Sequence, residues 1–352
     1  MIIEGTVKSG YESLRDLYEH NMRTLAERNT QLCIYVGEEC VVDLWASAID
    51  DHSFSADSLV NVFSSGKTLE AITLAMLHDR GLLDYNARIT DYWPEFGANG
   101  KDNITVADLM RHEAGLAAFD TSLEPRQLHP EQIKQNSIGA VVERHTPIFR
   151  PGEGNQREYH AITRGWIANE VFRRVEPAGR TMGQFLREEV SQPLGIDVHI
   201  GLNDDELDRI SPVAMLGFGY QFWQSLIPRA MGRKMENNLA QIIAKLWRLR
   251  GAIRNRTRPR APVPIIGMQK ISVVDTPDVA RGEIPSAGAK CSARGLAKLA
   301  AVMANGGRLN GQQFIGEAAF AAQHDVPIQR NMMALNTIFT QGGLATFPQP
   351  RP

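Results

Sequence analysis

Hydrophobic residues recur at helical spacing near the start of the chain, at Leu14, Leu17, Tyr18, Met22 and Leu25. This pattern predicts an amphipathic helix within residues 8–28. Two short runs rich in β-branched and aromatic residues follow, QLCIYVGEE and CVVDLWASA. Their composition and the charged turn between them predict an antiparallel hairpin. A helix followed by a hairpin indicates the edge of an α/β layer.

Helical patterns dominate the middle of the chain. TLEAITLAMLH, residues 68–78, is apolar around most of a helix and predicts a buried one that Gly81 can end. VADLMRHEAGL, IGAVVERH, ITRGWIANEVFRRV, MGQFLREEV and NNLAQIIAKLWRLRG continue the helical pattern, and strand patterns are sparse. CSARGLAKLAAVMANGG then predicts an amphipathic helix with a glycine stop. We therefore expect an α/β domain of residues 1–65 and 266–352 and an inserted, mainly helical domain of residues 66–265.

Composition and charge exclude few classes of function. The 352 residues are 43% hydrophobic, enough for a large core, and the net charge of -2 indicates no general affinity for nucleic acid or anionic membrane. The first residues lack a basic flank and apolar run, and no later run approaches eighteen apolar residues, so we expect a soluble, cytoplasmic protein without a membrane span. RLRGAIRNRTRPRAPVP is basic; a solvated loop is the favoured interpretation, and binding to an acidic partner or lipid is the alternative.

The three cysteines suggest no covalent or metal framework. Cys33, Cys40 and Cys291 form no CxxC pair and no zinc-ligand spacing, so we expect free buried thiols.

The segment NVFSSGKTLEAI places Ser64 and Lys67 three residues apart at the start of the apolar helix. One helical turn brings both side chains to the same face. A serine hydroxyl becomes a useful nucleophile when a base takes its proton, and a partly desolvated lysine can serve as that base. S-x-x-K is nevertheless common, and a serine at a helix start is usually a cap, so the motif alone does not establish catalysis.

The same segment partly matches the phosphate-binding loop GxxxxGK[ST]. Its first glycine is replaced by Asn61, and Val62 and Phe63 would crowd a loop whose amides must wrap phosphate oxygens. Nucleotide binding is therefore disfavoured.

Five segments resemble, in order, those of the beta-lactamase-related serine hydrolases: NVFSSGKTLEAITLAMLHDRGLLDYNARITDYWPEF, ITVADLMRHEAGL, REYHAITRGWIANEV, QPLGIDVHIGL and IPSAGAKCSARGLAKLAAVMANGG. The family includes class C beta-lactamases, DD-peptidases, family VIII carboxylesterases and animal beta-lactamase-like proteins. The resemblance runs from about residue 30 to the end of the chain. It implies an α/β fold of the beta-lactamase/transpeptidase type, with an antiparallel sheet flanked by helices and the active site at the junction with the helical domain.

The resemblance also assigns roles. Ser64 would be acylated, Lys67 would exchange its proton, and Tyr159 of the second motif, Tyr159-His160-Ala161, would be the general base or acid. The Ser64 amide would be one oxyanion donor, and no metal or organic cofactor would be needed. Ala161 departs from the Y-x-N or Y-x-S of the lactamases, which favours an ester-like substrate over a penicillin.

The third family motif, K-T-G, H-x-G or W-x-G, is not visible. The tail reads NTIFTQGGLATFPQPRP, in which Gly342 and Gly343 are the one candidate surrogate. Compared with the family, we expect a truncated isoform, an incomplete gene model or a fragment. His112 and His145 lack metal or triad spacing, and Trp166 and Trp223 are expected to be packing or pocket-wall residues.

Two functions remain open at this point. The first is a serine hydrolase that forms an acyl-enzyme with a small ester or amide substrate. The second is a catalytically inactive beta-lactamase-like protein that acts through binding or assembly. Neither interpretation names a substrate or an oligomeric state, and no nucleic-acid partner is expected.

Overall fold

The computed structural model describes residues 1–154, 156–244, 247, 261–332 and 335–346. Its N-terminal part is a three-stranded antiparallel sheet in the order β1-β3-β2. The predicted hairpin is confirmed as β2 (Asn29–Val36) and β3 (Glu39–Ser47). The strand β1 (Ile2–Val7), which pairs with the other edge of β3, was not predicted from the sequence. Gly5 explains why: it has a φ of 110° and lies where a Cβ would meet the Asp43 carbonyl, which is unusual inside a strand.

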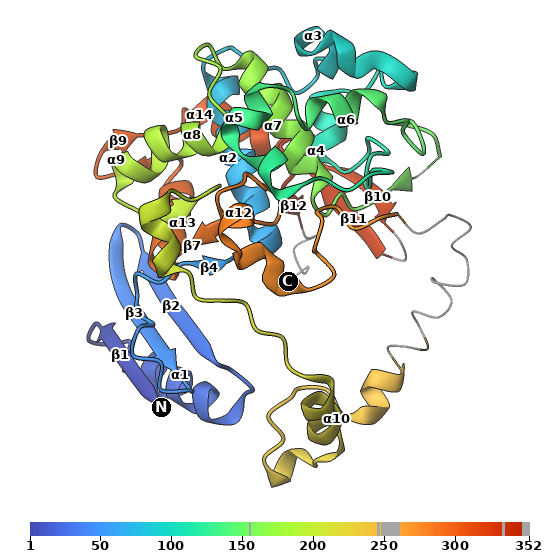
Figure 1. Cartoon of the computed structure of the whole chain (residues 1–352). Helices are drawn as coiled ribbons and strands as arrows, with labels where there is room; N and C mark the ends of the chain where they lie inside the picture. Colours follow the sequence, from blue (N-terminus) through green and yellow to red (C-terminus); the bar gives the residue numbers. More distant parts are fainter. Residues whose placement is uncertain (155, 245–246, 248–260, 333–334, 347–352) are drawn as a thin grey trace.

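Two helices from opposite ends of the chain cover this sheet (Figure 1). The predicted N-terminal helix is α1 (Glu12–Thr24), which buries Tyr18 and Met22 against Val42 and Leu44 of β3. The predicted late helix is α13 (Ala293–Ala304), which packs against β2. Its N-cap Ser292 accepts a hydrogen bond from Gly295 N, and this satisfies one amide of the first turn.

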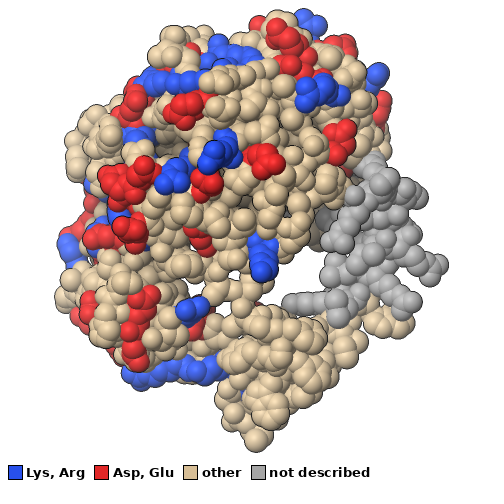
Figure 2. All heavy atoms as spheres, in the orientation of Figure 1, with Lys and Arg blue, Asp and Glu red and all other residues tan. Residues whose placement is uncertain are grey.

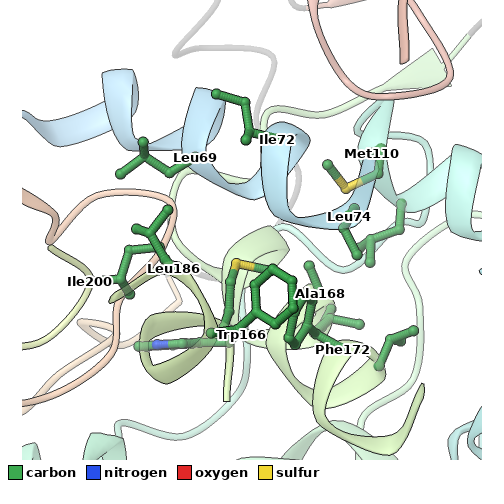
Figure 3. Close-up of a cluster of buried hydrophobic side chains, with 14 of the residues drawn as sticks. Leu69, Ile72, Leu74, Met110, Trp166, Ala168, Phe172, Leu186 and Ile200 are labelled. Carbon is green, nitrogen blue, oxygen red and sulfur yellow. The ribbon is translucent and has the colours of Figure 1, made fainter. Parts of the chain in front are cut away.

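The larger body of the molecule surrounds α2 (Lys67–Asp79), the helix that the sequence predicted to be buried. Every residue from Leu69 to Leu77 is buried. This helix packs against α7 (Thr163–Val175), α8 (Met182–Leu186) and α14 (Glu317–His324). Figure 3 shows Leu74 on the side of α2 that faces Ala168 and Phe172 of α7, whereas Ile72 points to the other side of α2. The apolar surface of α2 therefore anchors Ser64 and Lys67 at its start.

The remaining elements of the body are short. They are β4 (Val60–Asn61), η1 (Phe63–Gly66), α3 (Ile89–Tyr92), η2 (Pro94–Gly100), α4 (Val106–Met110), η3 (Pro125–Leu128), α5 (Pro130–Lys134), α6 (Gly139–Arg144), β5 (Gln156–Arg157), a π-helical turn (Arg187–Ser191), α9 (Gln192–Leu194), β6 (Val198–His199), η5 (Asp204–Arg209), η7 (Ile271–Asp275), α12 (Pro277–Ala280), β7 (Lys290–Cys291), β8 (Arg308–Leu309) and β9 (Gln312–Gln313).

Three strands near the C-terminus join the middle of the chain. The hairpin β10 (Ile328–Met332) and β11 (Leu335–Phe339) is extended by β12 (Ala345–Thr346), and β10 pairs in parallel with β5. The resulting order is β12-β11-β10-β5. Since β5 ends two residues before Tyr159, this sheet supports the loop that carries the second motif. The predicted domain division remains a prediction.

A separate lobe lies away from the body and carries α10 (Phe218–Leu226) and the turn η6 (Arg229–Met231). The predicted helix NNLAQIIAKLWRLRG lies partly in this lobe, where residues 239–244 are helical. Residues 248–260 of the predicted basic connection lie outside the described residues. In the described ranges, no helix combines the length and apolarity needed to cross a bilayer.

Candidate active site

The turn before α2 is fixed by pairing with a distant strand. The β4 strand pairs antiparallel with β7, and Val62 N donates to Ala289 O. Phe63 then has a φ of 46°, a left-handed conformation that is strained for a bulky side chain. The exposed Ser64 follows it in η1. The strained residue therefore stands directly before the predicted nucleophile, as is common at functional sites.

Close packing, and not phosphate binding, explains the glycine at position 66. A Cβ at this position would lie 2.5 Å from Pro285 O, so only glycine allows the 285–289 loop to approach α2. Lys67 Nζ, one residue on, donates to Ala161 O at 2.8 Å and Ser286 O at 3.0 Å. Lys67 Nζ thus donates to two carbonyl oxygens, whereas the lysine of a phosphate-binding loop would contact a phosphate.

The structure brings the three predicted site residues together. Tyr159 lies 95 positions from Ser64, and its phenol hydroxyl donates to Ser64 Oγ at 2.7 Å. Lys67 Nζ lies 4.9 Å from the centroid of the same ring. A nucleophile and a candidate proton carrier are thus in direct contact, with an amine beside them.

Burial changes the acidity of Lys67. Desolvation, with a contribution from the Arg164 charge, lowers its pKa to about 8, although Glu70 acts in the opposite direction. An ordinary lysine is almost fully protonated at neutral pH, because its pKa is near 10.4. At a pKa of about 8, roughly a tenth of the amine is neutral at pH 7 and can accept a proton.

A buried polar network holds the elements around the site. Glu70 of α2 receives a hydrogen bond from Arg164 Nε of α7 at 2.8 Å, and Ser286 Oγ donates to its other oxygen. Arg164 also donates to Met110 O at 3.0 Å and to Gly343 O at 3.3 Å. Both charged side chains are fully buried, so each needs the other. The network ties α2, α7 and the 285–289 loop together behind Lys67.

His112 makes a contact in the site that was not predicted from the sequence. Its ring lies 4.7 Å from the Tyr159 ring and 5.2 Å from the Phe339 ring. His112 Nδ1 accepts from His160 N at 3.0 Å. Burial, with help from Arg164, holds the pKa of His112 well below its ordinary value, so the ring is neutral. His112 therefore packs against the candidate proton carrier, and no spacing pattern in the sequence could have shown it.

His145, Trp166 and Trp223 were also singled out in the sequence. His145 packs edge-on against Phe119 with its Nδ1 3.6 Å from Asp120 Oδ1, and Trp166 is buried in the core. Trp223 was expected to be a packing or pocket-wall residue, and the packing alternative is wrong, because this side chain is 65% exposed on α10. Two of the predicted buried thiols also differ from expectation: Cys33 and Cys40 are only half-buried, and their sulfur atoms lie 3.6 Å apart.

Gly342 and Gly343, the candidate surrogate for the third motif, are placed for packing and not for oxyanion binding. Gly343 N donates to Thr340 O within its own turn, and Gly343 O accepts from Arg164. A Cβ on Gly342 would lie 2.6 Å from Gln323 O of α14. These glycines pack behind the site, and the Gly343 amide is already used, so the interpretation as an oxyanion strand is not supported.

Two cavities differ in their relation to the site. A polar cavity of about 330 Å³, lined by Arg187, Arg281 and Glu283 among others, involves neither Ser64 nor Tyr159. A small apolar cavity of about 50 Å³ is lined by Ala161, Phe119 and Trp166 and so adjoins the second motif. Among the described residues no group of three or more His, Cys, Asp or Glu side chains could hold a metal ion.

Comparison with known proteins agrees with this geometry. The model of the Beta-lactamase family matches residues 14–332, a range that includes Ser64, Lys67 and Tyr159. The chain belongs to the Beta-lactamase family. The predicted α/β fold of the beta-lactamase/transpeptidase type is confirmed by solved members.

Three relatives place the chain within the Beta-lactamase family. It is 32% identical over 290 residues to the esterase/beta-lactamase LipL of Mycobacterium tuberculosis, over 81% of this chain and 60% of that relative's length. A penicillin-binding protein homolog from Caulobacter crescentus is 29% identical with a TM-score of 0.72 over 97% of this chain and 82% of its own. A family VIII carboxylesterase is 27% identical with a TM-score of 0.74, over 97% and 83% of the two chains. This chain therefore spans less than two thirds of the length of LipL.

Proposed function

We propose that this protein is a serine hydrolase that forms an acyl-enzyme on Ser64 with a small ester substrate. The observation that carries the proposal is the 2.7 Å hydrogen bond between Tyr159 and Ser64, beside a lysine whose burial lowers its pKa to about 8. The names of two relatives, an esterase/beta-lactamase and a carboxylesterase, support this reaction class.

Acylation requires that Ser64 lose a proton as its oxygen attacks the substrate carbonyl carbon. The neutral Lys67 amine takes a proton from the Tyr159 hydroxyl as Tyr159 takes one from Ser64. As an ammonium, Lys67 has three protons, and two of them go to the carbonyls of Ala161 and Ser286. The third is the proton that exchanges with the Tyr159–Ser64 pair. The same proton then goes to the departing alcohol, which leaves the acyl group on Ser64.

Deacylation reverses the proton path. Water loses a proton to the Tyr159–Lys67 pair and attacks the acyl carbonyl, after which the proton returns to Ser64 and the carboxylic acid leaves. Negative charge on the carbonyl oxygen needs donors, and the Ser64 amide, at the start of the helical turn, is one candidate. The helix dipole of α2 acts in the same direction.

The substrate class follows from the second motif. Ala161 supplies no side-chain donor or acceptor, and its carbonyl is occupied by Lys67. The small apolar cavity next to it has room for a short alkyl group only. We therefore propose short-chain esters rather than lactams, whose amide substituent would meet no polar partner at this position.

Intact-mass analysis after exposure to a fluorophosphonate probe tests the proposal. We expect one adduct on the native chain, none on Ser64→Ala, and labelling slowed on the order of 100-fold in Tyr159→Phe. Ser65→Ala, which alters the neighbouring hydroxyl, should label at the rate of the native chain. Hydrolysis of 4-nitrophenyl acetate should follow the same order.

An absent adduct on folded protein would contradict the proposal. It would favour the alternative of a catalytically inactive protein that acts through binding or assembly. Circular dichroism and the urea midpoint of each variant separate a lost site from lost folding.

A further inference from the structure

The α10 lobe exposes an unusual set of apolar side chains. Phe218 is 85% exposed, Trp223 65%, and Phe222 and Leu226 50% each. Phe218, Phe222 and Leu226 are four residues apart and so form one stripe of the helix, with Trp223 beside it. Met215, before the helix, and Met231, after it, are more than 70% exposed. We call these six residues the α10 surface.

Along the sequence, charged residues near α10 fall into two blocks. Residues 210–228 contain no Asp, Glu, Lys or Arg, whereas residues 229–260 contain ten Lys or Arg and one acid, Glu236. Figure 2 shows the result: most of the visible face of this lobe is free of charged atoms. Arg229 and Lys234 are both exposed just beyond α10. The apolar residues are thus followed at once by positive charge.

Hydrogen bonds of the Lys234 backbone join the lobe to α10 and to the segment that follows α1. Gln224 and Ser225 are the buried residues of α10, and Gln224 Oε1 accepts from Lys234 N at 2.8 Å. Lys234 O in turn accepts from Ala26 N, in the segment that follows α1. The polar side of α10 therefore faces its own lobe, and the aromatic stripe faces outward.

A stripe of exposed Phe, Trp and Leu, followed in the chain by exposed Arg and Lys, complements one kind of surface. The interface of a bilayer accepts apolar and aromatic side chains below the headgroups, and anionic headgroups attract the cations beside them. Patches of contiguous exposed apolar residues are uncommon on proteins without such a role. We propose that the α10 surface docks this protein onto anionic lipid bilayers, with the helix lying in the interface and not crossing it.

This inference does not depend on the proposed catalysis. Ser64, Lys67 and Tyr159 belong to the body and the α10 surface to the lobe, so loss of one function should leave the other intact. If both hold, the chain would meet its ester substrates at a membrane surface.

Co-sedimentation with vesicles tests the docking. The full chain should bind vesicles of phosphatidylcholine with 30% phosphatidylglycerol at least tenfold more tightly than phosphatidylcholine alone. The double variant Phe218→Ser/Trp223→Ser should lose at least tenfold in affinity. Arg229→Gln/Lys234→Gln should lose about 25-fold, from about fivefold for each charge, and raised salt should weaken the native protein in the same way.

Matched controls use exposed residues elsewhere. Leu17→Ser, on the exposed side of α1, and Arg23→Gln should bind vesicles as the native chain does. All variants should keep the native probe labelling of Ser64, or lack it equally if the chain is inactive. Equal binding by native protein and Phe218→Ser/Trp223→Ser, or no binding to either vesicle, would overturn the inference.

Two other outcomes would also overturn it. Concentration-dependent dimerisation that Phe218→Ser/Trp223→Ser abolishes, without vesicle binding, would show that a second copy covers the surface. Tight binding to a single-stranded DNA 20-mer, again without vesicle binding, would show that the positive charge serves a nucleic acid.

Discussion

The region behind Lys67 and the α10 lobe both depart from the usual distribution of polar and apolar side chains, in opposite directions. Behind Lys67, charged residues are fully buried: Glu70 and Arg164 pair at 2.8 Å with no exposed atoms. In the lobe, Phe218 and Trp223 are mostly exposed. Both arrangements are costly by themselves, the first through desolvation and the second through contact of apolar surface with water.

The difference lies in what each region requires. The buried pair needs its partner within the same fold, so its removal should damage folding. The fold depends little on the exposed stripe, so removal of the stripe should weaken only an interaction with a partner outside the molecule. Stability and function should therefore separate between the two regions, and the four predictions below test that separation in order of decreasing effect.

Arg164→Met should lower the free energy of unfolding by about 3–5 kcal/mol, because it leaves the Glu70 carboxylate buried without its cation. Urea unfolding followed by circular dichroism measures the change. Arg23→Met, which removes an exposed ion pair with Glu19 at 3.3 Å, is the matched control and should cost less than about 1 kcal/mol. Equal costs for the two variants would show that the buried pair is not what holds this region.

Gly66→Ala should lower the free energy of unfolding by about 1–3 kcal/mol, because the new methyl group would lie 2.5 Å from Pro285 O. The backbone must shift to relieve this contact, and so Ser64 labelling by the fluorophosphonate should fall in the same variant. Gly81→Ala offers a contrast, since a Cβ there meets nothing within 4 Å and only its φ of 69° opposes it. Unchanged labelling in Gly66→Ala would disprove the close approach.

The rate of Ser64 labelling should rise with pH up to about 8 and then level off. The neutral Lys67 amine is the active form, so a pKa of about 8 makes the rate increase about tenfold per pH unit below that value. This corresponds to about 1.4 kcal/mol in the barrier per unit. Lys67→Met should abolish the rise. A rate that is flat between pH 6 and 9 would exclude Lys67 as the base.

Phe218→Ser/Trp223→Ser should change the free energy of unfolding by no more than about 0.5 kcal/mol per site, because both side chains are already exposed. The same urea experiment measures it. A loss of several kcal/mol would mean that the stripe packs against part of this chain, and the contrast between the two regions would then fail.

Prediction from sequence succeeded where the information is local. Ser64 and Lys67 share a helix start, so their spacing alone was enough to propose them as a pair. Tyr159 came only from the resemblance to the family, because a hydrogen bond across 95 positions leaves no local pattern. The β1 strand was missed because Gly5 interrupts its sequence pattern, and the contact of His112 with Tyr159 was missed because it depends on packing.

The sequence by itself determined the helices α1, α2 and α13, the β2–β3 hairpin and the family, since periodicity, caps and motifs are properties of neighbouring residues. Only the tertiary structure decided which polar groups lose water and which apolar groups keep it. Lys67 acquires a pKa of about 8 because α7 and the 285–289 loop cover it, and Trp223 is exposed because little of the described chain packs on it. Burial is set by elements distant in the sequence, and acidity and exposure follow from burial.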